Sequence, residues 1–185
     1  LLRKYTLKLN ILVVYPQSYG GPLSYILLTR PRDQALSFSE RLVKLGVLPK
    51  NILIDPILKI EGVEASYNFT SVRGLLITSA NAVAHLPADL IGSNLPTFCV
   101  GKATTRAAFK LGLMAQHVAE TAQGLCNVLS AQDPKGPLLH LRGAHTSLDF
   151  EVHFWDTRLN VQNLIIYQQI EQELGFEIYN LLRGT

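Results

Sequence analysis

The feature that most constrains this fold is a unit that occurs twice, in which a short apolar run ends in small polar residues and passes at once into a helical pattern. The first copy spans residues 75–81 (LLITSAN) and the second spans residues 98–105 (FCVGKATT). Short apolar runs of this kind are typical of buried strands, and strands alternate with helical patterns along the rest of the chain. Because short crossovers make such strands parallel, we predict an α/β fold with a parallel sheet and helices on both faces.

Periodicity and turn residues predict the other elements. We expect a helix over residues 32–45 whose buried face ends at Leu45, and a helix over residues 145–158 that directs Leu148, Val152 and Trp155 toward the sheet. Residues 51–60 are extended but contain Pro56, which favours an edge or linker strand. The remaining predictions are strands at 25–28, 114–118, 138–141 and 161–167 and helices at 61–70, 103–111, 121–130 and 171–182.

The composition limits the classes of function. The 185 residues are 48% hydrophobic and 17% charged, with a formal net charge of +3 and no dense run of Lys or Arg. We therefore expect no nucleic-acid partner, whereas a small basic excess suits an acidic small molecule. The apolar run at residues 11–15 is too short for a signal core or a membrane span, and Cys99 and Cys126 lack the spacing of a metal or disulfide site. We expect a cytoplasmic protein without a membrane partner.

Small polar and basic residues gather at the predicted carboxyl ends of the strands, where parallel sheets bind their ligands. These ends carry Thr29-Arg30, Thr78-Ser79, residues 101–104 and Arg142-Gly143. Ser79 or Asn81, and Thr104 or Thr105, stand where helix caps belong, and the free N–H groups of a helix N-terminus favour anions. We therefore predict that a carboxylate ligand binds at these strand ends.

The sequence lacks the motifs of several widespread types of site, which argues against those sites. Gly101-Lys102 resembles part of a phosphate-binding loop, but Pro96 stands where the loop requires glycine and Ala103 where it requires a hydroxyl. The chain has no G-x-G-x-x-G after a strand and no G-x-S-x-G elbow. Its five histidines lack the spacing of a zinc protease, and we expect His140 to be structural, within a strand.

Individual side chains at the strand ends offer further chemistry. Tyr167 ends an apolar strand, where a phenol could donate a proton to a departing hydroxyl; the alternative is a half-buried tyrosine whose O–H is satisfied within the fold. Arg30 and Arg142 are candidate carboxylate ligands, against the alternative of solvated loop arginines. His145, which follows Gly143, could also face a ligand.

Taken together, these segments resemble uroporphyrinogen-III synthases. The resemblance is carried, in family order, by YILL-TRP at residues 25–31, ITSANAV at 77–83, VGKAT at 100–104, the segment 138–143 and IYQ at 166–168. It covers residues 25–170.

The resemblance implies two flavodoxin-like α/β domains joined by a two-stranded linker, with the substrate between them. By this likeness residues 1–24 are an N-terminal extension, 25–54 and 170–185 belong to an incomplete domain one, and 55–169 hold the linker strands and a complete domain two. Family members return to domain one for further strands, whereas this sequence ends at Thr185. We therefore expect a truncated product with little or no activity alone.

The family reaction closes hydroxymethylbilane to uroporphyrinogen III with loss of water and inversion of ring D, in tetrapyrrole biosynthesis. By resemblance we expect a monomeric lyase without metal or organic cofactor. Tyr167 matches the tyrosine that assists hydroxyl departure. The substrate-binding residues are expected to be Arg30, Ser79, Gly101, Lys102, Thr104, Arg142 and Gly143.

Two other classes of function remain open at this point. The first is a non-catalytic flavodoxin-like module that binds an anionic small metabolite. The second is a scaffold that recruits a partner through an exposed half-domain.

Overall fold

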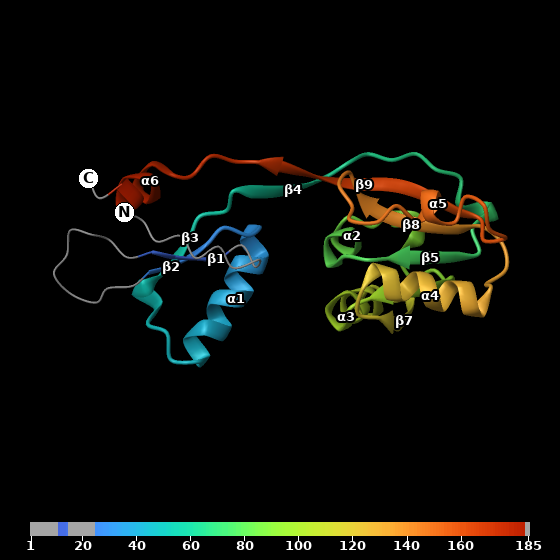
Figure 1. Ribbon diagram of the computed structural model, residues 1–185, viewed down its shortest axis with the longest axis horizontal. Helices are drawn as coiled ribbons and strands as arrows, with labels where there is room; N and C mark the ends of the chain where they lie inside the picture. The colour runs from blue at the N-terminus through green and yellow to red at the C-terminus, as the bar shows by residue number, and fades with distance from the viewer. Residues whose placement is uncertain (1–10, 15–24, 184–185) are drawn as a thin grey trace. The chain divides into compact units, whose positions relative to one another are not determined.

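The computed structural model describes residues 11–14 and 25–183, with side chains from Tyr25 to Leu181 (Figure 1). Apart from 11–14, the expected N-terminal extension lies outside the described residues. The chain divides into two compact units. One is Glu61–Gln169, and the other combines the described residues up to Ile60 with those from Ile170 onward.

The unit that combines residues up to Ile60 with those from Ile170 onward contains a three-stranded sheet with the order β1-β2-β3. Strand β2 (Tyr25–Leu28) pairs antiparallel with β1 (Ile11–Val14) and parallel with β3 (Ile52–Ile54). Helix α1 (Arg32–Lys44) follows β2, a short 3-10 helix spans Pro49–Asn51, and α6 (Phe176–Arg183) is the last helix. Helix α1 ends close to the predicted position, but Leu45 is 81% exposed, so its assignment to the buried face is wrong.

A six-stranded sheet dominates the second part of the chain, with the order β4-β9-β8-β5-β6-β7. The pairs β5–β6, β5–β8, β6–β7 and β8–β9 are parallel, which confirms the mostly parallel sheet. The boundaries between the two units fall within β4 and β9. The strands are β4 (Leu58–Gly62), β5 (Gly74–Ile77), β6 (Pro96–Val100), β7 (Met114–Ala119), β8 (Leu138–Gly143) and β9 (Val161–Glu171).

Helices flank both faces of this sheet. Helices α2 (Ala80–Ala84) and α3 (Lys102–Lys110) contact each other, whereas α4 (Ala122–Gln132) and α5 (Phe150–His153) share a separate core cluster. Right-handed crossovers explain this division, because the chain steps from β5 to β7 in one direction and from β7 back to β8 in the other. The shared cluster comprises Leu76, Phe98, Val100, Leu125, Cys126, Leu129, Leu138, Phe150, Phe154, Leu159 and Val161.

Two predicted helices differ from the structure. Residues 61–70 form the end of β4, a loop and the start of a 3-10 turn (Phe69–Ser71) instead of a helix. In the segment 145–158 only α5 is α-helical, and Val152 and Trp155 are 72% and 85% exposed. Phe150 and Phe154 pack into the core in their place, so the prediction is wrong for Val152 and Trp155, whereas Leu148 packs against the core as expected. Among the described helices, none is long and apolar enough to cross a bilayer.

The order of the strands locates the switch point of the sheet. From β5 the chain moves outward to β6 and β7, and then returns to the other side of β5 to form β8 and β9. Loops from the carboxyl ends of β5 and β8 therefore leave in opposite directions, and crevices of this kind bind ligands in open α/β sheets. Thr78-Ser79 and Arg142-Gly143 lie at these two ends.

Candidate functional site

The junction between β6 and α3 leaves a helix N-terminus open. Gly101 precedes the helix with a φ of 79° and provides no side-chain cap. The amides of Lys102, Ala103 and Thr104 therefore have no acceptor within the helix, and Lys102 and Ala103 are exposed. These amides and the helix dipole can bind an anion, which the nearby lysine also favours.

The expectation that Thr104 or Thr105 caps α3 is wrong. Thr104 lies within the helix and is 5% exposed. The Thr105 hydroxyl donates back to the carbonyl oxygen of Gly101 at 3.1 Å, so it bonds to an acceptor and leaves the open amides untouched. The sequence placed hydroxyls near the correct turn but assigned them the wrong partners.

The junction between β5 and α2 is closed by its own cap. The Oγ atom of Ser79 accepts a hydrogen bond from the Asn81 amide at 3.2 Å, as the sequence predicts for a cap at this position. Ser79 is half-buried. The two copies of the repeated unit therefore present different surfaces, because only α3 has uncapped amides.

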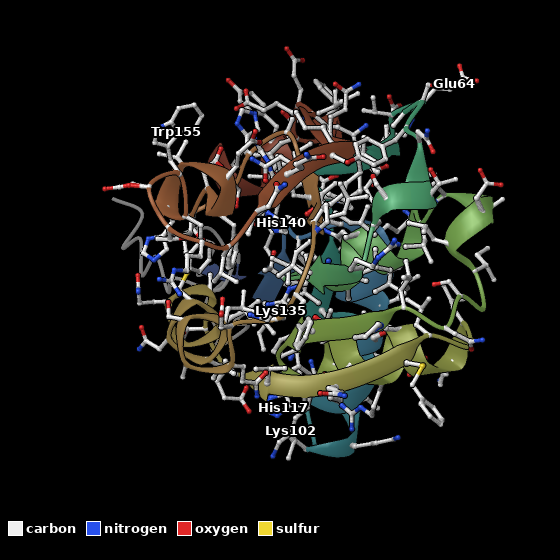
Figure 2. All side chains as sticks on the ribbon, turned by 90° about the vertical axis from the view of Figure 1, so that its right-hand side faces the viewer. Glu64, Lys102, His117, Lys135, His140 and Trp155 are labelled. Carbon is white, nitrogen blue, oxygen red and sulfur yellow. The ribbon has the colours of Figure 1, made fainter. Side chains whose placement is uncertain are left out.

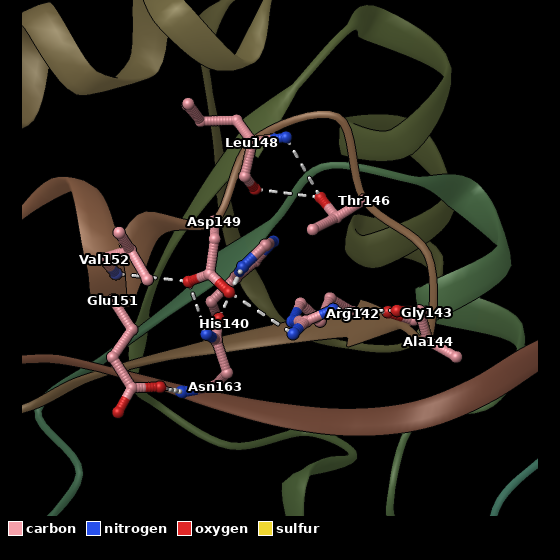
Figure 3. Close-up of polar contacts among 10 residues, drawn as sticks. All are labelled: His140, Arg142, Gly143, Ala144, Thr146, Leu148, Asp149, Glu151, Val152 and Asn163. Atoms are coloured by element: carbon pink, nitrogen blue, oxygen red, sulfur yellow. Dashed lines mark hydrogen bonds and ion pairs between the residues drawn. The ribbon is translucent and has the colours of Figure 1, made fainter.

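At the end of β8, Arg142 is held by neighbouring chain segments (Figure 3). Its Nη1 atom donates to the carbonyl oxygens of Gly143 at 3.0 Å and Ala144 at 3.1 Å, and its Nη2 atom lies 3.5 Å from Oδ2 of Asp149. The Arg142 side chain is 14% exposed. Most of its donors thus fix the loop after β8.

Behind Arg142 lies a buried polar chain that the sequence analysis did not predict. His140 is fully buried, with Nδ1 at 3.1 Å from Asn163 Oδ1 and Nε2 at 3.3 Å from Thr78 Oγ1. The Nδ2 atom of Asn163 donates to Asp149 Oδ1 at 2.7 Å. Hydrogen bonds therefore connect the residue after β5, the middle of β8 and the amino end of β9 to the residue that caps α5.

Within this hydrogen-bonded network, His140 and Asp149 have shifted pKa values. Burial lowers the pKa of His140 to about 4; the hydrogen bond to Asn163 opposes this and the Arg142 charge adds to it. For Asp149, burial alone would raise the pKa, but hydrogen bonds from Asn163 and the Val152 amide, with the Arg142 charge, hold it below its usual range. At neutral pH the imidazole is thus neutral and the carboxylate is ionised.

Tyr167 is directed by an irregularity in β9. In the register between β8 and β9, Arg142 pairs with Ile165 but Gly143 pairs with Tyr167, so Ile166 is an extra residue. A bulge reverses which face the following side chain points to. Tyr167 thus shares a face with the Cα hydrogen of Gly143, where a Cβ atom would lie 2.6 Å from the phenol ring.

His85 is a second residue that the sequence analysis missed at this site. Its ring stacks on that of Tyr167, with centroids 6.1 Å apart and an interplanar angle of 25°. Behind it, a Cβ atom at Gly62 would lie 3.0 Å from the imidazole. Tyr167 is 5% exposed between these partners, so the phenol ring is firmly positioned.

The remaining predicted site residues are more peripheral. Figure 2 shows Lys102 at the edge of the unit Glu61–Gln169, and His140 is buried inside that unit. His145 is exposed. Arg30 lies in the other unit, where its guanidinium stacks 4.5 Å above the ring of Phe38.

Among the described residues, neither a metal cluster nor the hollow beside Phe154 adds to the site at these strand ends. No group of three or more His, Cys, Asp or Glu side chains in that part of the chain is arranged to hold a metal ion. A hollow of about 300 Å³ lies beside Phe154, Arg158 and Gln162. It adjoins the amino end of β9, opposite the predicted ligand edge, so it does not belong to the same site.

Comparison with known proteins identifies the family. The family profile described as uroporphyrinogen-III synthase HemD matches residues 37–184. The chain belongs to the uroporphyrinogen-III synthase family.

A solved member supports the fold of this uroporphyrinogen-III synthase family chain. The crystal structure of uroporphyrinogen-III synthetase from Helicobacter pylori 26695 aligns with a TM-score of 0.56 and 14% sequence identity. The alignment covers 71% of this chain and 62% of that one, so the chain spans less than two thirds of this relative. A search of curated proteins finds no match.

Within this synthase family chain, the structure places most predicted site residues along one sheet edge. Ser79, Gly101 and Gly143 lie at the ends of the adjacent strands β5, β6 and β8, and Tyr167 lies in β9 beside Gly143. Arg30 is not among them. His140 lies buried within β8, which confirms the expectation of a structural histidine in a strand; its buried partners were not predicted, although a titratable side chain inside an apolar strand requires them.

Proposed function

We propose that this chain acts as a uroporphyrinogen-III synthase, which closes hydroxymethylbilane to uroporphyrinogen III with loss of water and inversion of ring D. The observation that carries this proposal is the family match over residues 37–184. The open N-terminus of α3 supports it, because the substrate bears many carboxylates and uncapped amides bind anions.

In this proposal the carboxylates bind along the carboxyl edge of the sheet. The amides of Lys102, Ala103 and Thr104 and the charge of Lys102 bind one group of them, whereas the Gly101 amide already donates to the Ala119 carbonyl oxygen at 2.8 Å. The Ser79 hydroxyl and the loop after Gly143 bind others. Arg142 contributes by holding that loop and through its positive charge, since its Nη atoms are already bonded within the chain. Arg30, which belongs to the other unit, remains a proposed carboxylate ligand.

Tyr167 is the proposed catalytic residue. Its phenol donates a proton to the hydroxyl group that leaves as water, and the electron pair of the pyrrole nitrogen stabilises the cationic methylene that remains. That methylene bonds to ring D at the carbon that already carries the bridge to ring C, which gives a spiro intermediate; the old bridge bond then breaks, and ring D rejoins the bridge carbon through its other, free α carbon. The phenolate recovers the proton that this carbon releases. Packing against Gly143 and His85 fixes the ring, so little reorganisation is needed at the proton-transfer step.

The test is an assay of the chain on freshly prepared hydroxymethylbilane, with the porphyrin isomers separated after oxidation. We expect Tyr167→Phe to lower kcat by about 100-fold or less while KM changes little, because the ring still packs and only the proton donor is lost. A wild-type chain that yields only the isomer without ring inversion would contradict the synthase activity. Unchanged kcat in Tyr167→Phe would contradict the role of the phenol and favour a module that only binds the anion.

A further inference from the structure

The hydroxyl of Thr78 is held by a histidine that the proposed reaction does not use. Thr78 follows the last residue of β5 and is half-buried, and its Oγ1 atom lies 3.3 Å from Nε2 of the fully buried His140. The next residue, Ser79, caps α2. Two hydroxyl-bearing residues thus follow one another in the chain at the switch point of the sheet.

The direction of each hydrogen bond in this network follows from the bond between Asn163 and Asp149. A carboxylate only accepts, so Nδ2 of Asn163 donates to Asp149 and Oδ1 of Asn163 faces the imidazole. The Nδ1 atom of His140 must therefore carry the proton. The burial that lowers the pKa of His140 to about 4 keeps Nε2 unprotonated at neutral pH. Nε2 accepts, so the Thr78 hydroxyl donates its single hydrogen to it.

The two neighbouring hydroxyls consequently have opposite hydrogen-bonding roles toward a ligand. Thr78 has lone pairs on Oγ1 but no hydrogen left to donate. Ser79 already accepts from the Asn81 amide, and its own hydrogen stays available. A carboxylate can bond to Ser79 but meets only electron pairs at Thr78. An N–H donor finds the reverse.

We propose that Thr78 is a substrate-positioning acceptor that bonds a pyrrole N–H of the bilane, with His140 acting as the residue that sets its direction. This inference rests on the proposed function, because it assigns a part of the same substrate. It divides the substrate between two chemistries: carboxylates bind at α3 and Ser79, and a ring nitrogen binds at the end of β5.

A pair of substitutions at Thr78 tests the acceptor. Thr78→Val keeps the shape and removes the oxygen, whereas Thr78→Ser keeps the oxygen. Because one neutral hydrogen bond is lost, we expect Thr78→Val to raise KM for hydroxymethylbilane by about threefold to tenfold with kcat little changed. Thr78→Ser should stay within about twofold of wild type. Equal KM values for Thr78→Val and wild type would overturn the proposal.

A second pair separates the positioning role of His140 from simple packing. His140→Gln places an amide oxygen near the Nε2 position and can still accept from Thr78, whereas His140→Asn reaches only the Nδ1 position. We expect His140→Gln to retain most of the affinity and His140→Asn to match Thr78→Val, with thermal midpoints measured for both. Equal loss in the two variants would indicate packing alone and overturn the positioning role.

Nitrogen NMR of the imidazole tests the direction of the hydrogen bonds without substrate. At pH 7 the wild-type chain should show a protonated Nδ1 and an unprotonated Nε2 at His140. The opposite tautomer would overturn the inference while leaving the proposed synthase activity intact. Failure of the wild-type chain to bind or convert hydroxymethylbilane, with the expected tautomer present, would instead overturn the proposed function and the ligand assigned here.

Discussion

The carboxyl ends of β6 and β8 lie on either side of β5 and treat their polar groups in opposite ways. At β8, hydrogen bonds connect His140, Asn163, Asp149 and Arg142, and Arg142 also donates to the Gly143 carbonyl oxygen, although its buried Nε atom has no partner. At β6, the first amides of α3 have neither an acceptor within the helix nor a side-chain cap. Buried polar groups need hydrogen-bond partners within the protein, whereas exposed amides can bond to water and remain available to a ligand.

The difference shows which end stabilises the fold and which end is available for binding. Substitutions at the end of β8 should mainly reduce the stability of the fold, because they leave buried groups without partners. Substitutions at the start of α3 should affect binding and leave the fold nearly unchanged. Three predictions test this contrast, from the largest expected effect to the smallest.

Removing Asp149 should have the largest effect on stability. Asp149→Ala leaves Nη2 of Arg142 and Nδ2 of Asn163 without their carboxylate acceptor and removes the cap of α5, whose Val152 amide donates to Asp149 at 3.2 Å. We expect a loss of about 2–4 kcal/mol, since the pair is only partly exposed. Chemical denaturation of the purified variant measures it.

Glu120→Ala is the control for this prediction. Glu120 pairs with His117 at 3.1 Å, but its side chain is 66% exposed, so the loss should be within about 0.5 kcal/mol. Similar losses in the two variants would mean that the network at β8 does not stabilise the fold more than a surface ion pair does.

Acid should destabilise the fold through His140. The imidazole has a folded-state pKa of about 4, below its ordinary pKa of 6.5, so between these pH values the unfolded chain binds a proton that the folded chain does not. Stability should therefore fall by roughly 2–3 kcal/mol as pH drops from 6.5 to 4, in addition to the effects of other groups. Denaturation curves at several pH values measure this fall.

His140→Gln should flatten the same pH dependence, because an amide does not titrate in this range. Charged groups that face the imidazole, Arg142 and Asp149, remain in the variant. If wild type and variant lose stability in parallel across this window, the acid sensitivity comes from another group.

The sequence predicted regular elements much better than it predicted this polar network. Residues 25–28 and 161–167 were recognised as strands because short apolar runs have few other uses, and the helix expected at 103–111 is α3, which Gly112 follows with a φ of 78°. The hydrogen-bonded network around His140 joins residues from two strands, β8 and β9, with Thr78 after β5 and Asp149 before α5, and no local sequence pattern reveals it. Its partners become apparent only when the register of the sheet is known.

Local ambiguity explains the other failures. In the segment 145–158 two apolar pairs compete for the buried face, and tertiary packing selects Phe150 and Phe154 over Val152 and Trp155. The orientation of Tyr167 depends on the extra residue Ile166 in β9. A bulge of this kind leaves no mark on an apolar run, so the sequence could name the tyrosine but not its neighbours.

The smallest expected effect lies at the open end of α3, where stability and binding should change in opposite directions. Lys102 places a cation at the positive end of the helix dipole, which is unfavourable for the isolated helix. Lys102→Glu should therefore stabilise the chain by about 0.5–1 kcal/mol. The same change should raise KM for hydroxymethylbilane about threefold to tenfold, because it repels the proposed carboxylates.

Lys110→Glu is the matched control, because Lys110 lies in the last turn of the same helix and is also exposed. A cation there stabilises the negative end of the dipole, so this substitution should destabilise the chain by a similar amount and leave KM unchanged. Denaturation curves and initial rates distinguish the two variants. A rise in KM of equal size in both would mean that the substrate responds only to net charge, and the open amides of α3 would no longer be the preferred carboxylate site.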